Sequence, residues 1–118
     1  MVAHGLEHAC LKTGGDITSD YLWCECRAGH AYLFVVADGE QIIGASVWRF
    51  ERWVSGRKYR CLCHYGTSMR DWADDMRDLV ERAAKAGGAT SLVMEGRRGW
   101  GRRYPEARML RYTFEVDL

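Results

Sequence analysis

The sequence predicts an α/β (α+β) protein in which helices cover both faces of a mixed, mostly antiparallel sheet. Between residues 31 and 66, apolar residues recur with a period of two in three consecutive segments. The turns between these segments contain glycine, which is typical of an antiparallel meander. A long amphipathic segment then leads to a short apolar one, and a crossover helix of this kind places the next strand parallel to its neighbour. We expect residues 1–118 to form a single domain.

Two short helices are expected before the strands. Residues 2–13 carry apolar side chains at helical spacing and are followed by two glycines, a common helix end. The next helix begins with Thr18 or Ser19 as its N-cap residue and places Leu22 and Cys26 on one face. Each helix therefore has an apolar side that can cover a sheet.

Three strands are expected next. The segment AYLFVVA is apolar on both faces, and Asp38 and Gly39 after it are a strong signal for a hairpin turn. The second strand, QIIGASVWRFERW, carries aromatic side chains that we expect to lie partly exposed, namely Trp48, Phe50 and Trp53. A turn at Ser55 and Gly56 leads to the third strand. Strict alternation predicts that one face of this strand is shared by Tyr59, Cys61, Cys63 and Tyr65.

The segment from residue 68 to residue 86 is the clearest helix in the sequence. Its apolar stripe consists of Met69, Trp72, Ala73, Met76, Leu79, Val80, Ala83 and Ala84. The segment ATSLVMEG after it is expected to form a short buried strand, and RMLRYTFEVDL, residues 108–118, a final half-exposed strand. Between these strands we expect a short helix with Trp100 packed beneath it.

The charges nearly balance, with 17 Lys and Arg against 16 Asp and Glu, so no strong overall field attracts the chain to nucleic acid. Positive charge is concentrated locally, in Arg97, Arg98, Arg102, Arg103, Arg108 and Arg111. Phosphate contact by Arg97 or Arg98, nucleic-acid binding through residues 97–111 and a solvated helix are the three interpretations. Nucleic-acid binding is the least favoured because no groove-reading motif accompanies the cluster.

The five cysteines occur without a signal peptide and without an apolar run of the roughly 18 residues that a membrane helix needs. We therefore expect free thiols in a reducing cytosol and no membrane span. His4 and His8 could ligate zinc, as could the cysteine pairs at positions 24 and 26 or 61 and 63. No pair has the C-x-x-C spacing, so we predict core cysteines and no metal site.

The strand pair LFVVADGEQIIGASV is followed by Trp72 early in the long helix, by Ala83 and Gly87 at its end, and then by GRRGW at residues 96–100. Together with the order of elements, these segments resemble the GNAT superfamily of N-acetyltransferases and, within it, the small GNAT-like proteins of tailed bacteriophages. The resemblance covers nearly the whole chain. It implies a GNAT-like sheet that opens beside acetyl-CoA, whose pyrophosphate lies at the N-terminus of the long helix.

The resemblance places Gly66, Thr67 and Ser68 at the turn that would hold the coenzyme diphosphate. Family members typically have Gln or Arg followed by x-x-Gly-x-Gly or Ala across this turn, whereas this chain has the single glycine Gly66. Asp71 follows closely, and a carboxylate beside a diphosphate costs roughly 1 kcal/mol at a surface dielectric. The coenzyme-binding turn is therefore degenerate.

Two catalytic candidates complete the site. Many GNAT enzymes have an Asn seven residues before a Tyr that protonates the leaving thiolate, and here Arg97 stands at the Asn position and Tyr104 at the Tyr position. Glu51 is the candidate general base for the amine, with an exposed strand edge as the alternative interpretation of its segment FERW. His64 lies next to the turn and is interpreted as a surface residue.

Three functions follow as hypotheses. The first is a phage-encoded, acyl-CoA-dependent N-acetyltransferase in the host cytoplasm. The second is a non-catalytic virion, assembly or host-interaction protein that uses the GNAT-like fold as a scaffold for a protein partner or a second copy of the chain. The third is a nucleic-acid binder through residues 97–111, whose affinity would fall steeply with salt.

Overall fold

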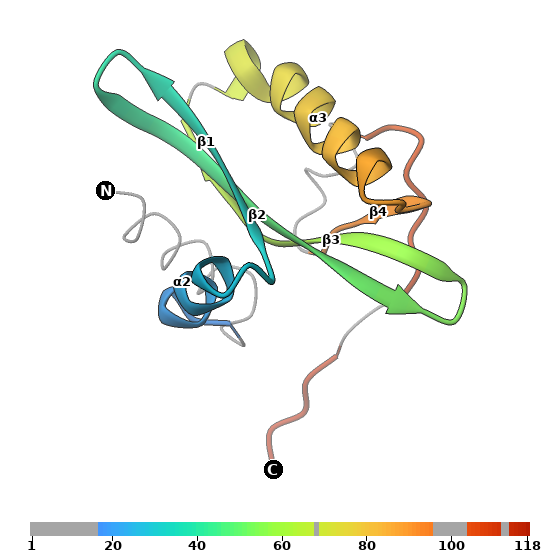
Figure 1. Ribbon diagram of the computed structural model, residues 1–118. Coiled ribbons are helices and arrows are strands. Elements are labelled where there is room, and N and C mark those ends of the chain that lie inside the picture. The colour runs from blue at the N-terminus through green and yellow to red at the C-terminus, as the bar shows by residue number, and fades with distance from the viewer. Residues whose placement is uncertain (1–16, 68, 96–103, 112–113) are drawn as a thin grey trace.

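The computed structural model describes residues 17–67, 69–95, 104–111 and 114–118, without the side chains of Met69 and Arg70. Its elements are α2 (Ser19–Arg27), β1 (Tyr32–Asp38), β2 (Gln41–Trp53), β3 (Gly56–Gly66), α3 (Met69–Ala86) and β4 (Ser91–Val93). The strands form one sheet in the order β1-β2-β3-β4 (Figure 1). The first three strands pair antiparallel, and β4 runs parallel to β3 as the sequence predicts. The helix predicted at residues 2–13 lies outside the described residues.

Local signals position the elements where the sequence predicts them. The Thr18 hydroxyl accepts a hydrogen bond from the backbone N–H of Tyr21 at 3.1 Å, so Thr18 is the N-cap residue of α2. Gly39 has a φ of 63° at the tip of the β1–β2 hairpin, a conformation that glycine adopts without steric cost. Turn and cap chemistry therefore set the boundaries of these elements.

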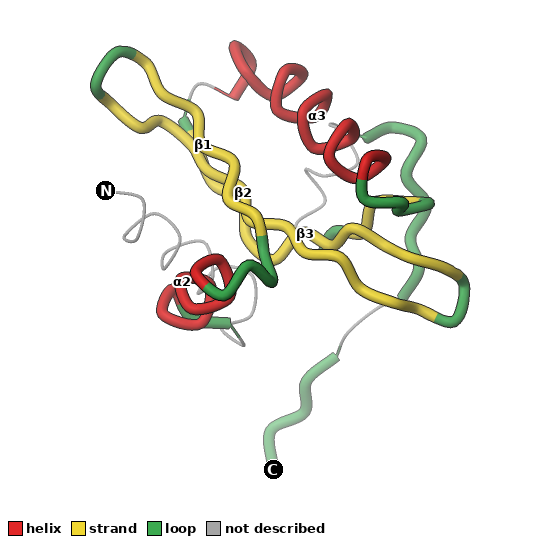
Figure 2. The backbone as a smooth tube through the Cα atoms, in the orientation of Figure 1, coloured by secondary structure: helices red, strands yellow, loops and turns green. Residues whose placement is uncertain are grey.

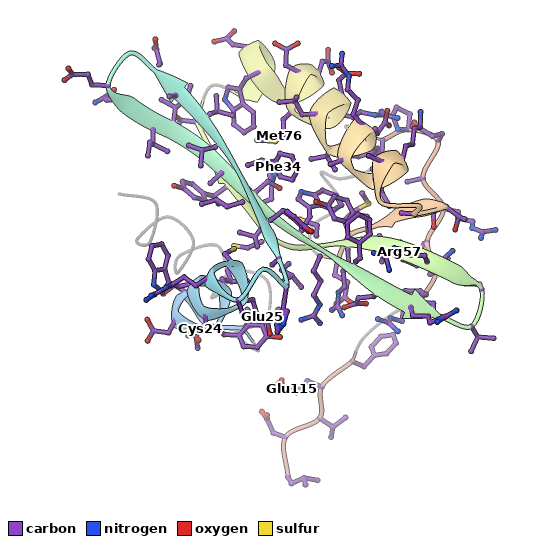
Figure 3. The ribbon with its side chains drawn as sticks, in the orientation of Figure 1. Cys24, Glu25, Phe34, Arg57, Met76 and Glu115 are labelled. Atoms are coloured by element: carbon purple, nitrogen blue, oxygen red, sulfur yellow. The ribbon has the colours of Figure 1, made fainter. Side chains whose placement is uncertain are left out.

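Helices α2 and α3 cover opposite faces of the sheet, which confirms the predicted fold class (Figure 1). The α2-side cluster consists of Leu22, Ala31, Val47, Leu62 and Cys63. The α3-side cluster consists of Trp48, Tyr59, Cys61, Trp72, Met76, Val80 and Ala84. Figure 3 shows Phe34 of β1 and Met76 of α3 between the sheet and the helix, at the centre of this second cluster. Trp48 is 1% exposed, so the prediction that it lies partly exposed is wrong.

A β-bulge in β3 divides the two cysteines of this strand between the two faces. Val47 pairs with Cys63 and the next residue, Trp48, pairs with Cys61, so Leu62 is an extra residue on β3. Cys61 consequently joins the α3-side cluster, while Leu62 and Cys63 join the α2-side cluster. The prediction that Cys61 and Cys63 share one face is therefore wrong, because a bulge interrupts the period of two.

Trp72 fastens the start of α3 to the sheet. Its indole N–H donates a hydrogen bond to the carbonyl oxygen of Thr67 at 2.7 Å, and its ring lies over Gly44 and Gly66. A Cβ atom at Gly44 would lie 2.7 Å from the Trp72 ring, closer than atoms pack in proteins. Glycine at these paired positions therefore lets the indole lie directly on the backbone of β2 and β3.

The described residues of the C-terminal segment, 108–111 and 114–118, form no strand, so the predicted final strand is wrong for them. Leu110, Phe114 and Val116 are exposed, and Figure 2 shows residues 114–118 as a loop that leads away from the sheet. Alternating side chains favour a strand only where a neighbouring strand supplies hydrogen bonds and an apolar face. Among the described residues, no helix is long and apolar enough to cross a membrane.

Candidate functional site

The candidate site lies where β3 and β4 stop pairing. Their parallel ladder runs from Lys58 and Ser91 to Arg60 and Val93, and β3 continues to Gly66 with no further partner on this edge among the residues that the structure describes. We call residues Cys61–Gly66 the open half of β3. Helix α3 begins three residues after the open half ends. The strand that separates from β4 therefore leads, through its open half, to the N-terminus of α3, and helix N-termini attract anions.

The turn between β3 and α3 is held by hydrogen bonds within the protein. The Thr67 N–H donates to the carbonyl oxygen of Ile43 at 2.9 Å, and the Thr67 carbonyl accepts from Trp72. Gly66 is half-buried beneath the Trp72 ring, where a side chain would meet the indole. Packing against Trp72 is therefore sufficient to explain the glycine at this position, without a bound phosphate. Ser68 lies outside the described residues. The Thr67 N–H is therefore already used, and among the described residues the first turn of α3 is where an anion would find backbone N–H groups.

Tyr104 lies against α3. It is 8% exposed, and the Arg77 guanidinium stands 4.2 Å from the centre of its ring. Burial raises the pKa of Tyr104 to about 12, and the Arg77 charge opposes part of that rise. A phenol with this pKa stays protonated at neutral pH and does not act as a base, and the raised pKa also makes it a weaker acid than an ordinary tyrosine.

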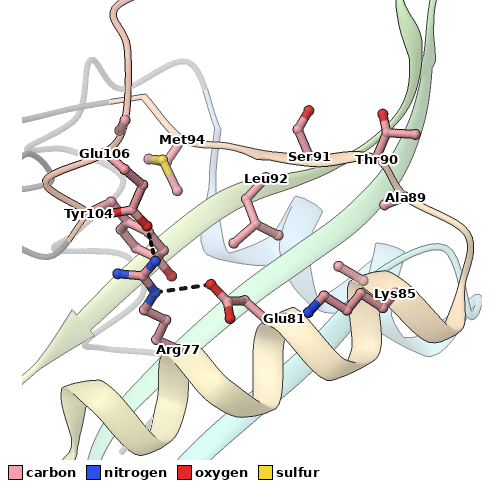
Figure 4. A pocket seen from close by; sticks show the side chains of 12 residues that line it. Arg77, Glu81, Lys85, Ala89, Thr90, Ser91, Leu92, Met94, Tyr104 and Glu106 are labelled. Carbon is pink, nitrogen blue, oxygen red and sulfur yellow. Dashed lines mark hydrogen bonds and ion pairs between the residues drawn. The ribbon is translucent and has the colours of Figure 1, made fainter.

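A pocket of about 330 Å³ opens between α3, β4 and the segment that begins at Tyr104 (Figure 4). Its floor is apolar and includes Ala84, Leu92 and Met94. Its rim is charged, since Arg77 donates to Glu81 at 3.0 Å and also pairs with Glu106. An apolar floor with a few charged groups at the rim is the usual lining of a small-molecule site.

Glu51 lies in a network of arginines on β2 and β3. Its carboxylate accepts hydrogen bonds from Arg49 at 2.8 Å and from the Trp53 indole at 3.0 Å, and Arg60 stands 3.4 Å away. Burial alone would raise the pKa of Glu51, but the hydrogen bonds from Trp53 and Arg49 and the charges of Arg60 and Arg49 outweigh it, so the pKa is lowered. A lowered pKa weakens a base. The base role of Glu51 stays a prediction.

A polar cluster that the sequence analysis did not single out lies beneath Trp72. Ser46 is fully buried, and its hydroxyl oxygen accepts a hydrogen bond from the Trp48 indole at 2.6 Å. His64 Nδ1 lies 3.1 Å from the same oxygen, and the sulfur of Cys61 lies 4.0 Å from it. His64 is half-buried, with its ring centre 5.9 Å from that of Trp72, and so differs from the expected surface residue.

Arg97 and Arg98 lie outside the described residues. Of the described members of the arginine-rich segment, Arg111 donates to Glu95 at 3.0 Å and lies 5.7 Å from the centre of the Trp53 ring. Within the described part of the chain, no three His, Cys, Asp or Glu side chains gather in a way that could hold a metal ion. Gly66 and Thr67 therefore lie together at the turn before α3. Tyr104 contacts Arg77 of α3, and Glu51 contacts Arg49, Trp53 and Arg60, so none of these contacts joins either candidate to the turn.

No family model matches the chain, and no curated protein matches it. Solved structures of acetyltransferases do match its fold. A GCN5-related N-acetyltransferase from Ralstonia eutropha matches with a TM-score of 0.77 at 12% identity, over 98% of this chain and 90% of that one. A predicted acetyltransferase from Clostridium acetobutylicum, solved with acetyl-CoA, matches with a TM-score of 0.65 at 15% identity, over 85% of this chain and 71% of that one.

The ribosomal-protein-alanine N-acetyltransferase from Brucella melitensis matches with a TM-score of 0.63 at 14% identity, over 98% of this chain and 93% of that one. At such low identity these likenesses concern the fold alone. The chain has a GNAT-like fold, that of the GNAT-family acetyltransferases.

Proposed function

We propose that this protein is an acyl-CoA-dependent N-acetyltransferase, which transfers an acetyl group from acetyl-CoA to an amine in a ternary complex. The observation that carries the proposal is the separation of the parallel strands β3 and β4 beside the N-terminus of α3. In a GNAT-like fold this is where an acyl-CoA would enter. Tyr104 is the candidate proton donor; it is protonated at neutral pH, but burial raises its pKa to about 12 and so makes it a weaker donor than an ordinary tyrosine.

The chain's own groups suit this chemistry at two points. The first turn of α3 offers backbone N–H groups and a partial positive charge to a diphosphate, although Asp71 in that turn opposes an anion. The Tyr104 hydroxyl would protonate the sulfur that leaves when the thioester is cleaved. Acetyl-CoA, when bound, supplies the activated acyl group. The Asp71 charge and the single glycine of the turn predict weak binding of the coenzyme.

Two measurements test the proposal. Isothermal titration with acetyl-CoA is expected to give a saturable heat, and mass spectrometry is expected to detect acetylation in a panel of small primary amines and peptide N-termini. The control is Y104F, which should bind acetyl-CoA as the unmodified protein does while its turnover falls. Absence of heat and of thermal stabilisation at millimolar acetyl-CoA would rule the proposal out.

A non-catalytic interaction role is the second candidate, and a surface feature favours it. Among the described strands β1 is at the edge of the sheet. Its Leu33 and Val35 are exposed, as are Trp23 of α2 and Ile42 of β2. Exposed apolar side chains on an edge strand favour association with a protein partner or a second copy. Light scattering during size exclusion tests self-association, and L33E with V35E should abolish any dimer it detects.

We further infer a tailed-bacteriophage origin, and with it a place in the host cytoplasm or the virion. This inference is supported by the GRRGW segment at residues 96–100 of the sequence. Detection of the protein by mass spectrometry in purified virions or in infected cells would distinguish the two locations.

A further inference from the structure

Strand β1 has an open outer edge. It lies at the end of the strand order β1-β2-β3-β4, so its outward backbone N–H and C=O groups have no strand partner among the residues that the structure describes. Leu33 and Val35 are 39% and 44% exposed on one face of the strand, and Tyr32 is 50% exposed on the other. An edge of this kind is a template for a further strand.

Three features that protect other edge strands are missing from β1. Residues 32–37 include no charged residue and no proline. The register against β2 does shift once, but Val36 pairs with Gly44 and the next residue with Ile42, so the extra residue, Ile43, belongs to β2. Strand β1 itself is regular, and a partner strand can therefore pair along its whole length.

A second copy of β1 fits this edge in a register that pairs every residue. In an antiparallel pair with its two-fold axis at Val35, the midpoint of Tyr32–Asp38, all seven residues of the strand find a partner. Val35 then lies opposite Val35 of the second copy, and Leu33 lies opposite Ala37. The exposed apolar side chains of one copy are thus covered by those of the other.

The polar residues at the two ends of β1 match in the same register. Tyr32 lies opposite Asp38 of the second copy, and the two-fold axis repeats this contact at the other end. Both side chains are exposed. A phenol O–H is a donor and an ionised carboxylate is an acceptor, so each end of the strand pair gains one charge-assisted hydrogen bond.

The charges beyond the strand ends favour the antiparallel direction. The hairpin after β1 carries Asp38 and Glu40 and no basic residue, whereas Arg27 precedes the strand, next to the contact of His30 with Glu25 at 3.2 Å. An antiparallel copy brings each acidic hairpin toward the end that carries Arg27, and a parallel copy would bring the two acidic hairpins together. A second copy thus supplies both halves of the complementarity.

We propose that β1 pairs antiparallel with β1 of a second copy, which joins the two sheets into one continuous sheet about a two-fold axis. This inference makes the interaction role, the second candidate function, specific, and it does not depend on acetyl transfer. Two strands of seven residues form a small contact compared with the roughly 1,200–2,000 Å² buried in stable complexes. We therefore expect a reversible dimer.

Sedimentation of the full chain at concentrations from about 5 to about 500 µM measures the dimer. The mass should rise from that of one chain toward that of two. V35E and V35K each bring like charges together at the axis, so each should raise the dimer Kd at least about tenfold. An equal mixture of V35E and V35K should restore the dimer, because the axis then joins a carboxylate to an ammonium group.

The matched control is L79E, which places the same charge at a side chain that is 52% exposed on α3. It should leave the dimer Kd unchanged. Circular dichroism checks that each variant folds. If the Val35 variants do not fold, hydrogen exchange of the unmodified protein decides the proposal, since the β1 amides should exchange more slowly at about 500 µM than at about 5 µM.

Three results would overturn the proposal. The first is a chain that stays monomeric at every concentration, which would leave a different protein as the partner of this edge. The second is a dimer that V35E and V35K leave intact, because its interface must then lie elsewhere. The third is a mixture of the two variants that stays monomeric. The binding of acetyl-CoA is measured separately, so acetyl transfer stands or falls independently of these results.

Discussion

Replacing Gly66 with alanine is expected to lower the free energy of unfolding by about 2–3 kcal/mol, because the new methyl group meets the Trp72 ring. A Cβ atom at this position would lie 2.7 Å from Cη2 of Trp72, and closer still to Cζ2. Carbon atoms pack at about 3.5–4.0 Å, so the ring must move by about 1 Å. Movement on the other side is blocked, since the Ile43 carbonyl oxygen would lie 3.1 Å from the same Cβ.

The magnitude follows from two losses and one gain. Overpacking costs about 1–3 kcal/mol, and displacement of the ring weakens the Trp72 hydrogen bond to Thr67, worth about 1 kcal/mol. Alanine returns about 0.5 kcal/mol by reducing the entropy of the unfolded chain. For a chain of 118 residues, a loss of about 2–3 kcal/mol lowers Tm by about 8–12 °C.

Thermal and urea unfolding, followed by circular dichroism, measure the effect. W72F is the matched background, because its shorter ring leaves room at position 66 and the alanine should then cost less than about 1 kcal/mol. A G66A protein as stable as its parent, or an equal cost in both backgrounds, would refute the reasoning that Trp72 requires glycine here.

Three further predictions concern individual side chains. E51Q should cost about 1–2 kcal/mol at pH 7 through lost charged hydrogen bonds. The pKa of Glu51 is lower in the folded protein than in the unfolded chain. Its stabilisation is therefore complete above the unfolded-state pKa and is lost as the pH falls through the folded-state pKa. Urea unfolding at pH 7 and pH 3 measures the cost of E51Q at each pH. Y104F should lower kcat about 10- to 100-fold with KM unchanged, measured by acetyl-product formation. Cys61 should react with a thiol reagent only after unfolding, whereas exposed Cys24 reacts in the native protein, as peptide mass mapping can show.

Each of these predictions has a contrary result. An equal cost of E51Q at both pH values would show that the carboxylate charge is not what stabilises the strand pair. A Y104F protein with undiminished turnover would exclude the phenol as proton donor. Native-state labelling of Cys61 as fast as that of Cys24 would show that the α3-side cluster opens freely to solvent.

Local chemistry in the sequence was sufficient to predict most elements of the fold. Asp38 and Gly39 mark the first hairpin, and Thr18 caps α2 where its hydroxyl suggests. The long helix before the short strand β4 predicts the parallel pairing that the structure contains. These signals act over a few residues or fix the direction of a crossover, so a single sequence carries them.

Contacts between distant residues could not be predicted in the same way. The bulge at Leu62 changes which cysteine faces α3, and no residue type at that position announces it. The contact of His64 with Ser46 depends on the register of β3 against β2 after the bulge, so the sequence showed only a lone histidine. Glu51 has Arg49 on its own strand and gains Arg60 through strand pairing, and both charges lower the pKa that a base would need raised.

The C-terminal segment shows the limit of periodicity. Leu110, Phe114 and Val116 alternate with polar residues as in a strand, but the described residues of this segment have no strand beside them. A pattern of side chains specifies which face would be buried and does not supply the surface that buries it. The Arg111 contact with Glu95 depends likewise on the folded arrangement.

The most direct test of the account is the binding of acetyl-CoA where β3 and β4 separate. Titration of the full chain, together with amide chemical shifts, should show saturable binding and shifts concentrated at Gly66, Thr67 and the first turn of α3. Saturating ligand at about 100 times Kd should also stabilise the fold by about 2.7 kcal/mol. A protein that gives no heat, no amide shifts in this region and no thermal stabilisation at millimolar acetyl-CoA would contradict the account.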